Sequence, residues 1–135
     1  RILPPSKIRV KNLDNALISE GCIIDAESIQ HSVIGIRSRI GQGTIIKDTY
    51  IMGSDNYQKL AKIQHCVYNN IPYIGIGINC NISGAIIEKN TRIGNNVTIK
   101  GGEHLDDYET DTYTIKDGVI VIKNSATIPS NTTIE

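Results

Sequence analysis

Residues 76–99 decide the fold, and they read IGINCNISGAIIEKNTRIGNNVTI. An isoleucine recurs every six positions, with one step shortened, and a smaller side chain lies two residues before each later one. Such a pair has the alternation of a short strand with both side chains on one face, and Gly and Asn fill gaps where tight turns tolerate positive φ. A short strand and a turn at this period are typical of a parallel β-helix of hexapeptide repeats. The recurring isoleucines are Ile76, Ile82, Ile87, Ile93 and Ile99.

The same period continues on both sides of this stretch. The ten-residue step from Ile24 to Ile34 indicates a shortened corner near Gln30. We therefore expect an all-β chain with a β-helix over residues 17–135, in roughly four or five triangular coils. Residues 1–16 begin with a Pro pair that excludes a helix, and we expect a linker from something upstream. The other expected inward positions are Ile18, Ile24, Ile34, Ile40, Ile46, Met52, Ile122, Ile128 and Ile134.

Two segments interrupt the repeats. Residues 53–73 lose the period, but Leu60, Ile63 and Val67 have helical spacing. This insertion is either a short helix or an irregular loop, since isolated helices of this length are marginal. Residues 101–111 are polar and acidic, which favours a solvated loop.

Composition limits the possible partners. The chain has 135 residues, enough for one domain with a core, and has neither Phe nor Trp, so isoleucine must fill the interior. Its 14 basic residues balance 14 acidic ones, so global charge favours neither nucleic acid nor a membrane surface as partner. The sequence contains no run of membrane-spanning length, and we expect no signal peptide. The first residue is Arg1 instead of Met, from which we expect that a longer protein was cut here.

The cysteines indicate a reducing, intracellular compartment. There are three of them, an odd number, and Cys22 and Cys80 occupy the small inward slot of a repeat. Buried free thiols are the expected state.

The sequence offers no catalytic constellation. A metal site or an acyltransferase site on a hexapeptide helix would need histidine, and His31, His65 and His104 have neither matched spacing nor a recognisable partner. The glycines serve coil turns and form no phosphate-binding loop. We expect no catalytic residue, no metal and no cofactor in this chain. A hexapeptide-repeat acyltransferase and a purely structural β-helix remain as alternatives, because the fold does not determine the function.

Basic residues give the strongest functional signal. Lys89, Lys123, Arg37 and Arg92 lie on turn or outward positions. Each alone is typical of a solvated side chain, but several on one face would bind a phosphate-like anion. We also expect an apolar stripe of Ile23, Ile45 and Ile51, each next to an inward aliphatic residue, to form an interface.

Six segments, in order along the chain, resemble a known family, the plant and cyanobacterial glucose-1-phosphate adenylyltransferases (ADP-glucose pyrophosphorylases). The resemblance is to their C-terminal domain, a left-handed parallel β-helix, and spans nearly the whole chain. The segments are LPPSK (3–7), HSVIGIRSRI (31–40), MGSDNY (52–57), IGIG (74–77), AIIEKNTRIGNNV (85–97) and DGVIVIKNSATIP (117–129).

The resemblance implies an enzyme that makes ADP-glucose and pyrophosphate from ATP and glucose 1-phosphate for starch or glycogen synthesis. Mg²⁺ and ATP would bind only in an upstream catalytic domain. The β-helix would contribute to a homo- or heterotetramer and to regulation by 3-phosphoglycerate and orthophosphate, in the cytoplasm or plastid stroma. Lys89 in EKNTRIG and Lys123 in VIKNSA match the two activator-associated lysines of the family, and Arg37 in GIRS matches a position near the effector region. Glu88 stands where the family often has Asp.

Overall fold

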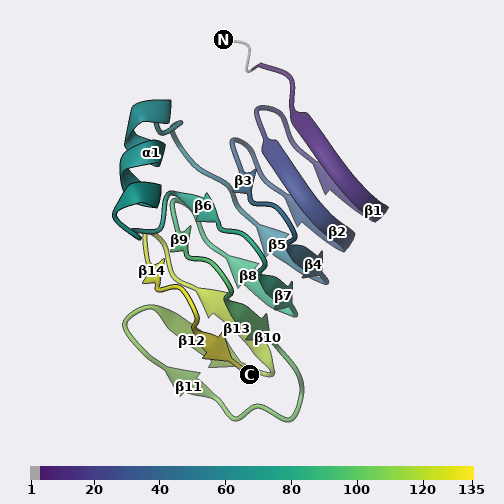
Figure 1. Cartoon of the computed structure of the whole chain (residues 1–135). Coiled ribbons are helices and arrows are strands. Elements are labelled where there is room, and N and C mark those ends of the chain that lie inside the picture. Colours follow the sequence, from purple (N-terminus) through teal and green to yellow (C-terminus); the bar gives the residue numbers. More distant parts are fainter. Residues whose placement is uncertain (1–3) are drawn as a thin grey trace.

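The chain forms a stack of short parallel strands wound around a narrow interior (Figure 1). The structure is a computed structural model and describes residues 4–135. The strands are β1 (Lys7–Ile18), β2 (Ile23–Ile34), β3 (Arg39–Ile40), β4 (Ile45–Lys47), β5 (Tyr50–Ile51), β6 (Gly75–Ile76), β7 (Asn81–Ser83), β8 (Ala85–Ile87), β9 (Arg92–Ile93), β10 (Thr98–Lys100), β11 (Tyr108–Glu109), β12 (Tyr113–Lys116), β13 (Val119–Ile122), β14 (Thr127–Ile128) and β15 (Thr133–Ile134). The single helix of the described residues is α1 (Leu60–Tyr68).

Three faces result from the strand pairing. The first face contains β3, β6, β9 and β14, and the second face contains β4, β7, β10 and β15. The third face contains β5, β8 and β13 and is extended by the antiparallel strands β12 and β11. β2 turns around two corners and pairs with β3, β4 and β5 in succession, so one continuous strand contributes to all three faces. The predicted parallel β-helix is therefore confirmed.

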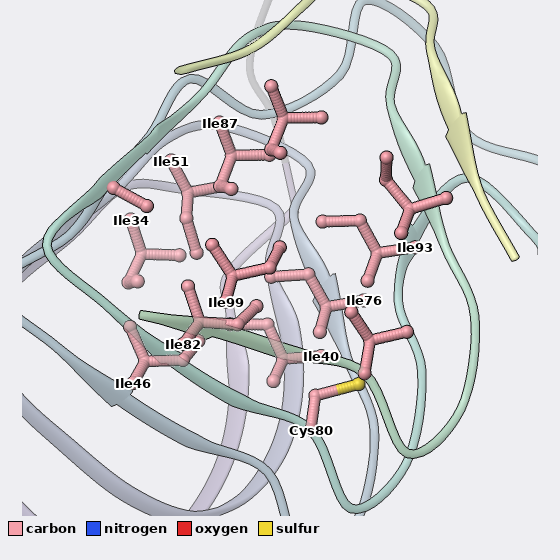
Figure 2. Close-up of a cluster of buried hydrophobic side chains, with 14 of the residues drawn as sticks. Ile34, Ile40, Ile46, Ile51, Ile76, Cys80, Ile82, Ile87, Ile93 and Ile99 are labelled. Carbon is pink, nitrogen blue, oxygen red and sulfur yellow. The ribbon is translucent and has the colours of Figure 1, made fainter. Parts of the chain in front are cut away.

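Three ladders of isoleucine fill the interior (Figure 2). Parallel register places the inward residue of each coil directly on that of the next coil, and every ladder residue is at most 5% exposed. The ladders are Ile24–Ile40–Ile76–Ile93–Ile128, Ile29–Ile46–Ile82–Ile99–Ile134 and Ile34–Ile51–Ile87–Ile122.

The predicted inward position of Met52 and outward position of Ile51 are wrong. Ile51 is buried at 5% exposure, and Met52 begins the following turn. The inward residues on either side of the corner between the second and third faces are five positions apart at Ile29–Ile34, Ile46–Ile51 and Ile82–Ile87. A left-handed residue, His31, Asp48 or Gly84, makes the tight turn there. The shortened corner near Gln30 thus recurs in other coils, and in the coil of β4 and β5 it moves Ile51 inward.

The first coil begins earlier than predicted. Ile8, Leu13 and Ile18 of β1 are in register with the inward Ile24, Ile29 and Ile34 of β2. The predicted linker over residues 1–16 is therefore wrong for residues 7–16, while residues 1–3 lie outside the described residues. Ile8 and Leu13 are exposed because no further described coil covers them.

Both interruptions have defined structure. The insertion 53–73 contains the short helix α1, which lies beside the first face (Figure 1) and buries Ile63 and Cys66. Within the acidic loop 101–111, Tyr108 and Glu109 form β11 of a hairpin with β12. Leu105 of the same loop packs against the hydrophobic core. The predicted solvated loop is therefore partly a structural element.

All three cysteines are free and buried. This was predicted for Cys22 and Cys80, which occupy the small inward positions of the repeat. Burial raises the pKa of the Cys22 and Cys80 thiols, which makes them poor nucleophiles.

We predict that Ile93→Asp strongly destabilises the 135-residue chain. Ile93 is 1% exposed between Ile76 and Ile128, so its replacement buries an unpaired carboxylate. The loss in unfolding free energy should be on the order of 5 kcal/mol, comparable to the stability of a small domain. The control is Thr127→Asp on the exposed side of β14, which should change stability by less than about 0.5 kcal/mol. Urea unfolding followed by circular dichroism measures both, and coincident curves for Ile93→Asp and the parent would show that the assigned register is wrong.

Candidate anion-binding edge

The turns that join the third face to the first face form one continuous edge of the prism. In each coil this turn follows the inward isoleucine of the third face, and backbone hydrogen bonds connect it to the turn of the adjacent coil. These bonds are Arg37 N to Glu20 O (3.2 Å), Ser54 N to Ile36 O (2.9 Å), Asn90 N to Gly53 O (3.1 Å) and Ser125 N to Lys89 O (2.9 Å). Turns that are far apart in the sequence therefore lie next to each other along this edge.

Three of the four predicted anion-binding residues lie on this edge, which we call the basic edge: Arg37, Lys89 and Lys123. Since Ile87 is in register with Ile122, the turns of Lys89 and Lys123 belong to neighbouring coils. Arg37 lies in the turn after β2, which is separated from the Lys89 turn by the Ser54 turn. The stacking of coils thus brings these positions together, as the anion-site hypothesis requires.

Lys89 already contacts a carboxylate. Its Nζ lies 3.0 Å from Oδ1 of Asp55, and the Asn90 side-chain amide donates to Oδ2 of Asp55 at 2.9 Å. The Asp55 backbone N–H donates in return to Asn90 Oδ1 at 2.9 Å. The hydrogen bonds from Asn90 and Lys89, together with the nearby charges of Lys89 and Arg37, lower the pKa of Asp55. The site therefore holds one carboxylate through both of its oxygens.

Lys123 is bound more firmly to the protein. Its Nζ donates to Glu109 Oε2 at 3.1 Å and to the backbone carbonyl of Thr110 at 2.6 Å. Both acceptors belong to the acidic loop 101–111, which the hairpin of β11 and β12 holds beside the edge. Glu88, where the family often has Asp, accepts from the Asn124 backbone N–H at 2.8 Å and so connects the two lysine turns.

Arg37 contacts the start of the insertion. One guanidinium nitrogen lies 3.4 Å from the carbonyl oxygen of Ser54, and the guanidinium carbon lies 5.7 Å from the centre of the Tyr57 ring. The Tyr57 hydroxyl donates to the Gly21 carbonyl at 3.1 Å. Arg37 therefore helps to hold residues 54–57 on the edge.

Arg92 is not brought to the basic edge. It lies in β9 on the first face, and its guanidinium donates to the carbonyl of Pro72 at 2.9 Å and lies 4.0 Å from the Cys66 sulfur. This side chain attaches the returning end of the insertion to the coils.

Sequence reasoning missed the two acids of the edge. Asp55 comes from the insertion and Glu109 from the acidic loop, and neither segment follows the repeat. The only sequence signal for Glu109 was the concentration of acids in residues 101–111.

The predicted interface residues do not form one stripe. Ile23 and Ile45 are each 38% exposed, but Ile23 is in register with Arg39 and Ile45 with Ser28 and Asn81, on different faces. Ile51 is buried. An outward apolar column does exist on the third face, in a common register. Its members, which we call the third-face column, are Leu17, Val33, Tyr50, Ile86 and Val121.

Two histidines have side-chain partners, contrary to the sequence-based expectation. His65 lies within 3.4 Å of the Asn69 side-chain amide, and His31 contacts an acid. His31 Nδ1 lies 2.9 Å from Asp48 Oδ1, on neighbouring coils, but both side chains are largely exposed. Among residues 4–135, no three His, Cys, Asp or Glu side chains gather in a way that would hold a metal ion. In the same residues, no helix has the length and apolar character to cross a membrane.

Two comparisons with known proteins, by family model and by similar sequence, agree with each other. Residues 1–133 match the family model described as the GLGC left-handed parallel β-helix domain. The glucose-1-phosphate adenylyltransferase small subunit, chloroplastic/amyloplastic, of Triticum aestivum is 43% identical over 136 residues. The match covers 99% of this chain but 29% of the wheat protein, so the chain spans less than a third of that relative. The chain belongs to the GLGC left-handed parallel β-helix domain family.

Proposed function

We propose that this chain is the regulatory and assembly domain of a glucose-1-phosphate adenylyltransferase. Such an enzyme joins ATP and glucose 1-phosphate into ADP-glucose and pyrophosphate for starch or glycogen synthesis. The name of the wheat relative and the match over 99% of this chain support the proposal. Nucleotidyl transfer, with ATP and Mg²⁺, belongs to an upstream catalytic domain. The chloroplastic/amyloplastic relative favours the plastid stroma over the cytoplasm.

The observation that carries the regulatory role is the basic edge. Lys89 and Asn90 hold the two oxygens of the Asp55 carboxylate, so the same donors suit a carboxylate or phosphate of an effector. Lys123 lies one coil away and Arg37 lies on the other side of the Ser54 turn. An effector such as 3-phosphoglycerate, which carries a carboxylate and a phosphate, fits an edge with several separated cations.

The strength of such a site suits a metabolite. Each charge-assisted hydrogen bond contributes roughly 1.5–3 kcal/mol, so two of them give about 3–6 kcal/mol. That range corresponds to millimolar or somewhat tighter binding. The domain would therefore respond to effectors at metabolite concentrations.

The third-face column supports the assembly role. Leu17 is 71% exposed and Tyr50 is 48% exposed, and register aligns both with Val33, Ile86 and Val121. An aligned apolar column on one face of a monomer is a typical protein contact surface. We assign it to the contact with another subunit of the proposed homo- or heterotetramer.

One observation bears on the acyltransferase alternative. His31 lies beside Asp48 next to the third-face column, as a general base beside an apolar groove would. The histidine side chain is 70% exposed, however, so bulk water surrounds the pair. The edge with three cations therefore favours the regulatory role.

We predict that charge reversal on the basic edge weakens activation. In the full-length enzyme, Lys89→Glu should raise the 3-phosphoglycerate concentration for half-activation by about tenfold or more, because one charge-assisted bond is replaced by repulsion. Lys123→Glu should act in the same direction. The rate at saturating effector should stay nearly unchanged, since no reacting group is assigned to this domain.

The matched control is Lys11→Glu. Lys11 forms an exposed pair with Glu27 at 3.5 Å on another part of the surface, so the variant has the same charge change away from the edge. Activation curves should be unchanged for this control. If the half-activation concentration is also unchanged in both Lys89→Glu and Lys123→Glu, the regulatory assignment is lost.

We predict that charges in the third-face column dissociate the oligomer. The double variant Val33→Glu/Tyr50→Glu should move the full-length enzyme to smaller species in light scattering after size-exclusion chromatography, because two buried carboxylates oppose the contact. The control Ile45→Glu, on the second face between Ser28 and Asn81, should leave the mass unchanged. An intact oligomer in the double variant would rule out this surface as the contact.

A further inference from the structure

The contact between Asp55 and Lys89 joins two parts of the fold. Lys89 and Asn90 belong to a coil turn, whose position the isoleucine ladders fix. Asp55 belongs to the insertion, outside the repeats. The contact is therefore made by a side chain that is free to leave without disturbing any strand.

From this arrangement we propose that Asp55 is an internal competitor of the anionic effector. Its carboxylate occupies the Lys89 ammonium and the Asn90 amide when no effector is bound, and the effector must displace it. This inference rests on the proposed function and adds to it the mechanism by which the site is kept closed.

The contact has the strength that a competitor needs. The side chains of Lys89 and Asp55 are 42% and 54% exposed, so water competes for both groups. Exposed ion pairs are weak, and the usual range corresponds to a factor of roughly 1.4 to 5 in an equilibrium constant. An effector that offers two anionic groups can therefore replace the single carboxylate.

The other ion pair of the edge, between Lys123 and Glu109, cannot exchange in this way. Lys123 is held by Glu109 and also by the carbonyl of Thr110, so removal of the Glu109 carboxylate does not free the ammonium. We therefore assign the exchange to Asp55 and not to Glu109.

Displacement of Asp55 has a structural consequence. Residues 55–58 lead into α1 and are held through three side chains. Asp55 contacts Lys89 and Asn90, Tyr57 contacts Gly21 and Arg37, and Gln58 accepts from the backbone N–H of Ile74. Of these contacts, only those of Asp55 involve the Lys89 turn, whereas Tyr57 contacts Arg37 and Gly21 in other turns of the edge. Binding of an anion would therefore loosen the start of the insertion.

The test uses the full-length protein and inorganic phosphate as the probe, with affinity measured by equilibrium dialysis. Asp55→Asn keeps the shape and removes the competing charge, so it should lower the dissociation constant roughly two- to fivefold. The control Glu88→Gln removes the same charge from the Lys89 turn, but Glu88 bonds to the Asn124 backbone and to no lysine. Glu88→Gln should change the phosphate dissociation constant by less than half the factor seen for Asp55→Asn. Equal effects of the two substitutions, or no effect of Asp55→Asn, would overturn the inference.

A double-mutant cycle separates this inference from the proposed function. Lys89→Gln should weaken phosphate binding, and Asp55→Asn should have a clearly smaller effect in that background, because, of the two donors for which both anions compete, only the Asn90 amide remains. Additive effects would show that Asp55 acts elsewhere, and they would leave the anion site intact. If Lys89→Gln alone does not change phosphate binding, the proposed function and this inference both fail.

Discussion

The stacking of isoleucine on isoleucine is the constraint on which the rest of the structure depends. Each inward side chain lies in register with the equivalent side chains of the adjacent coils, and the sequence has no Phe or Trp that could disturb the spacing. A shift of one residue in any coil would move its ladder members to the surface. Because the register is fixed, the turns are fixed as well, and Lys89 and Lys123 lie on adjacent turns although they belong to separate blocks of the sequence.

The repeat made most of the fold predictable. An aliphatic residue every six positions identifies the strands and the inward face without any knowledge of three-dimensional contacts. The prediction failed for Ile51 and for residues 7–16 because the step into the third face is five residues. In β1 the two steps, from Ile8 to Leu13 and on to Ile18, are both of this length, so a search at a period of six misses the first coil.

The candidate site was predictable only in part, for a related reason. Lys89, Lys123 and Arg37 lie within the repeat, so their common edge follows from the register. Asp55 and Glu109 lie in segments that interrupt the repeat, where the period carries no information about position. For Arg92 the repeat predicted the outward position in β9 correctly. It could not predict the partner of this side chain, the carbonyl of Pro72, because Pro72 belongs to the insertion. The chemistry of this edge thus depends on contacts between repeats and insertions.

The two acids also explain how a row of cations is tolerated on one edge. Positive charges on stacked turns repel one another, and Asp55 and Glu109 compensate for this in the absence of an anion. The folded state lowers the pKa of Asp55, so its stabilising contact is present above the ordinary aspartate pKa and is lost only as the pH falls through the lower folded value. At neutral pH the carboxylate is therefore fully charged, and protons do not control its exchange. The exchange of Asp55 for an external anion then depends on the concentration of that anion and on the number of charges that it carries.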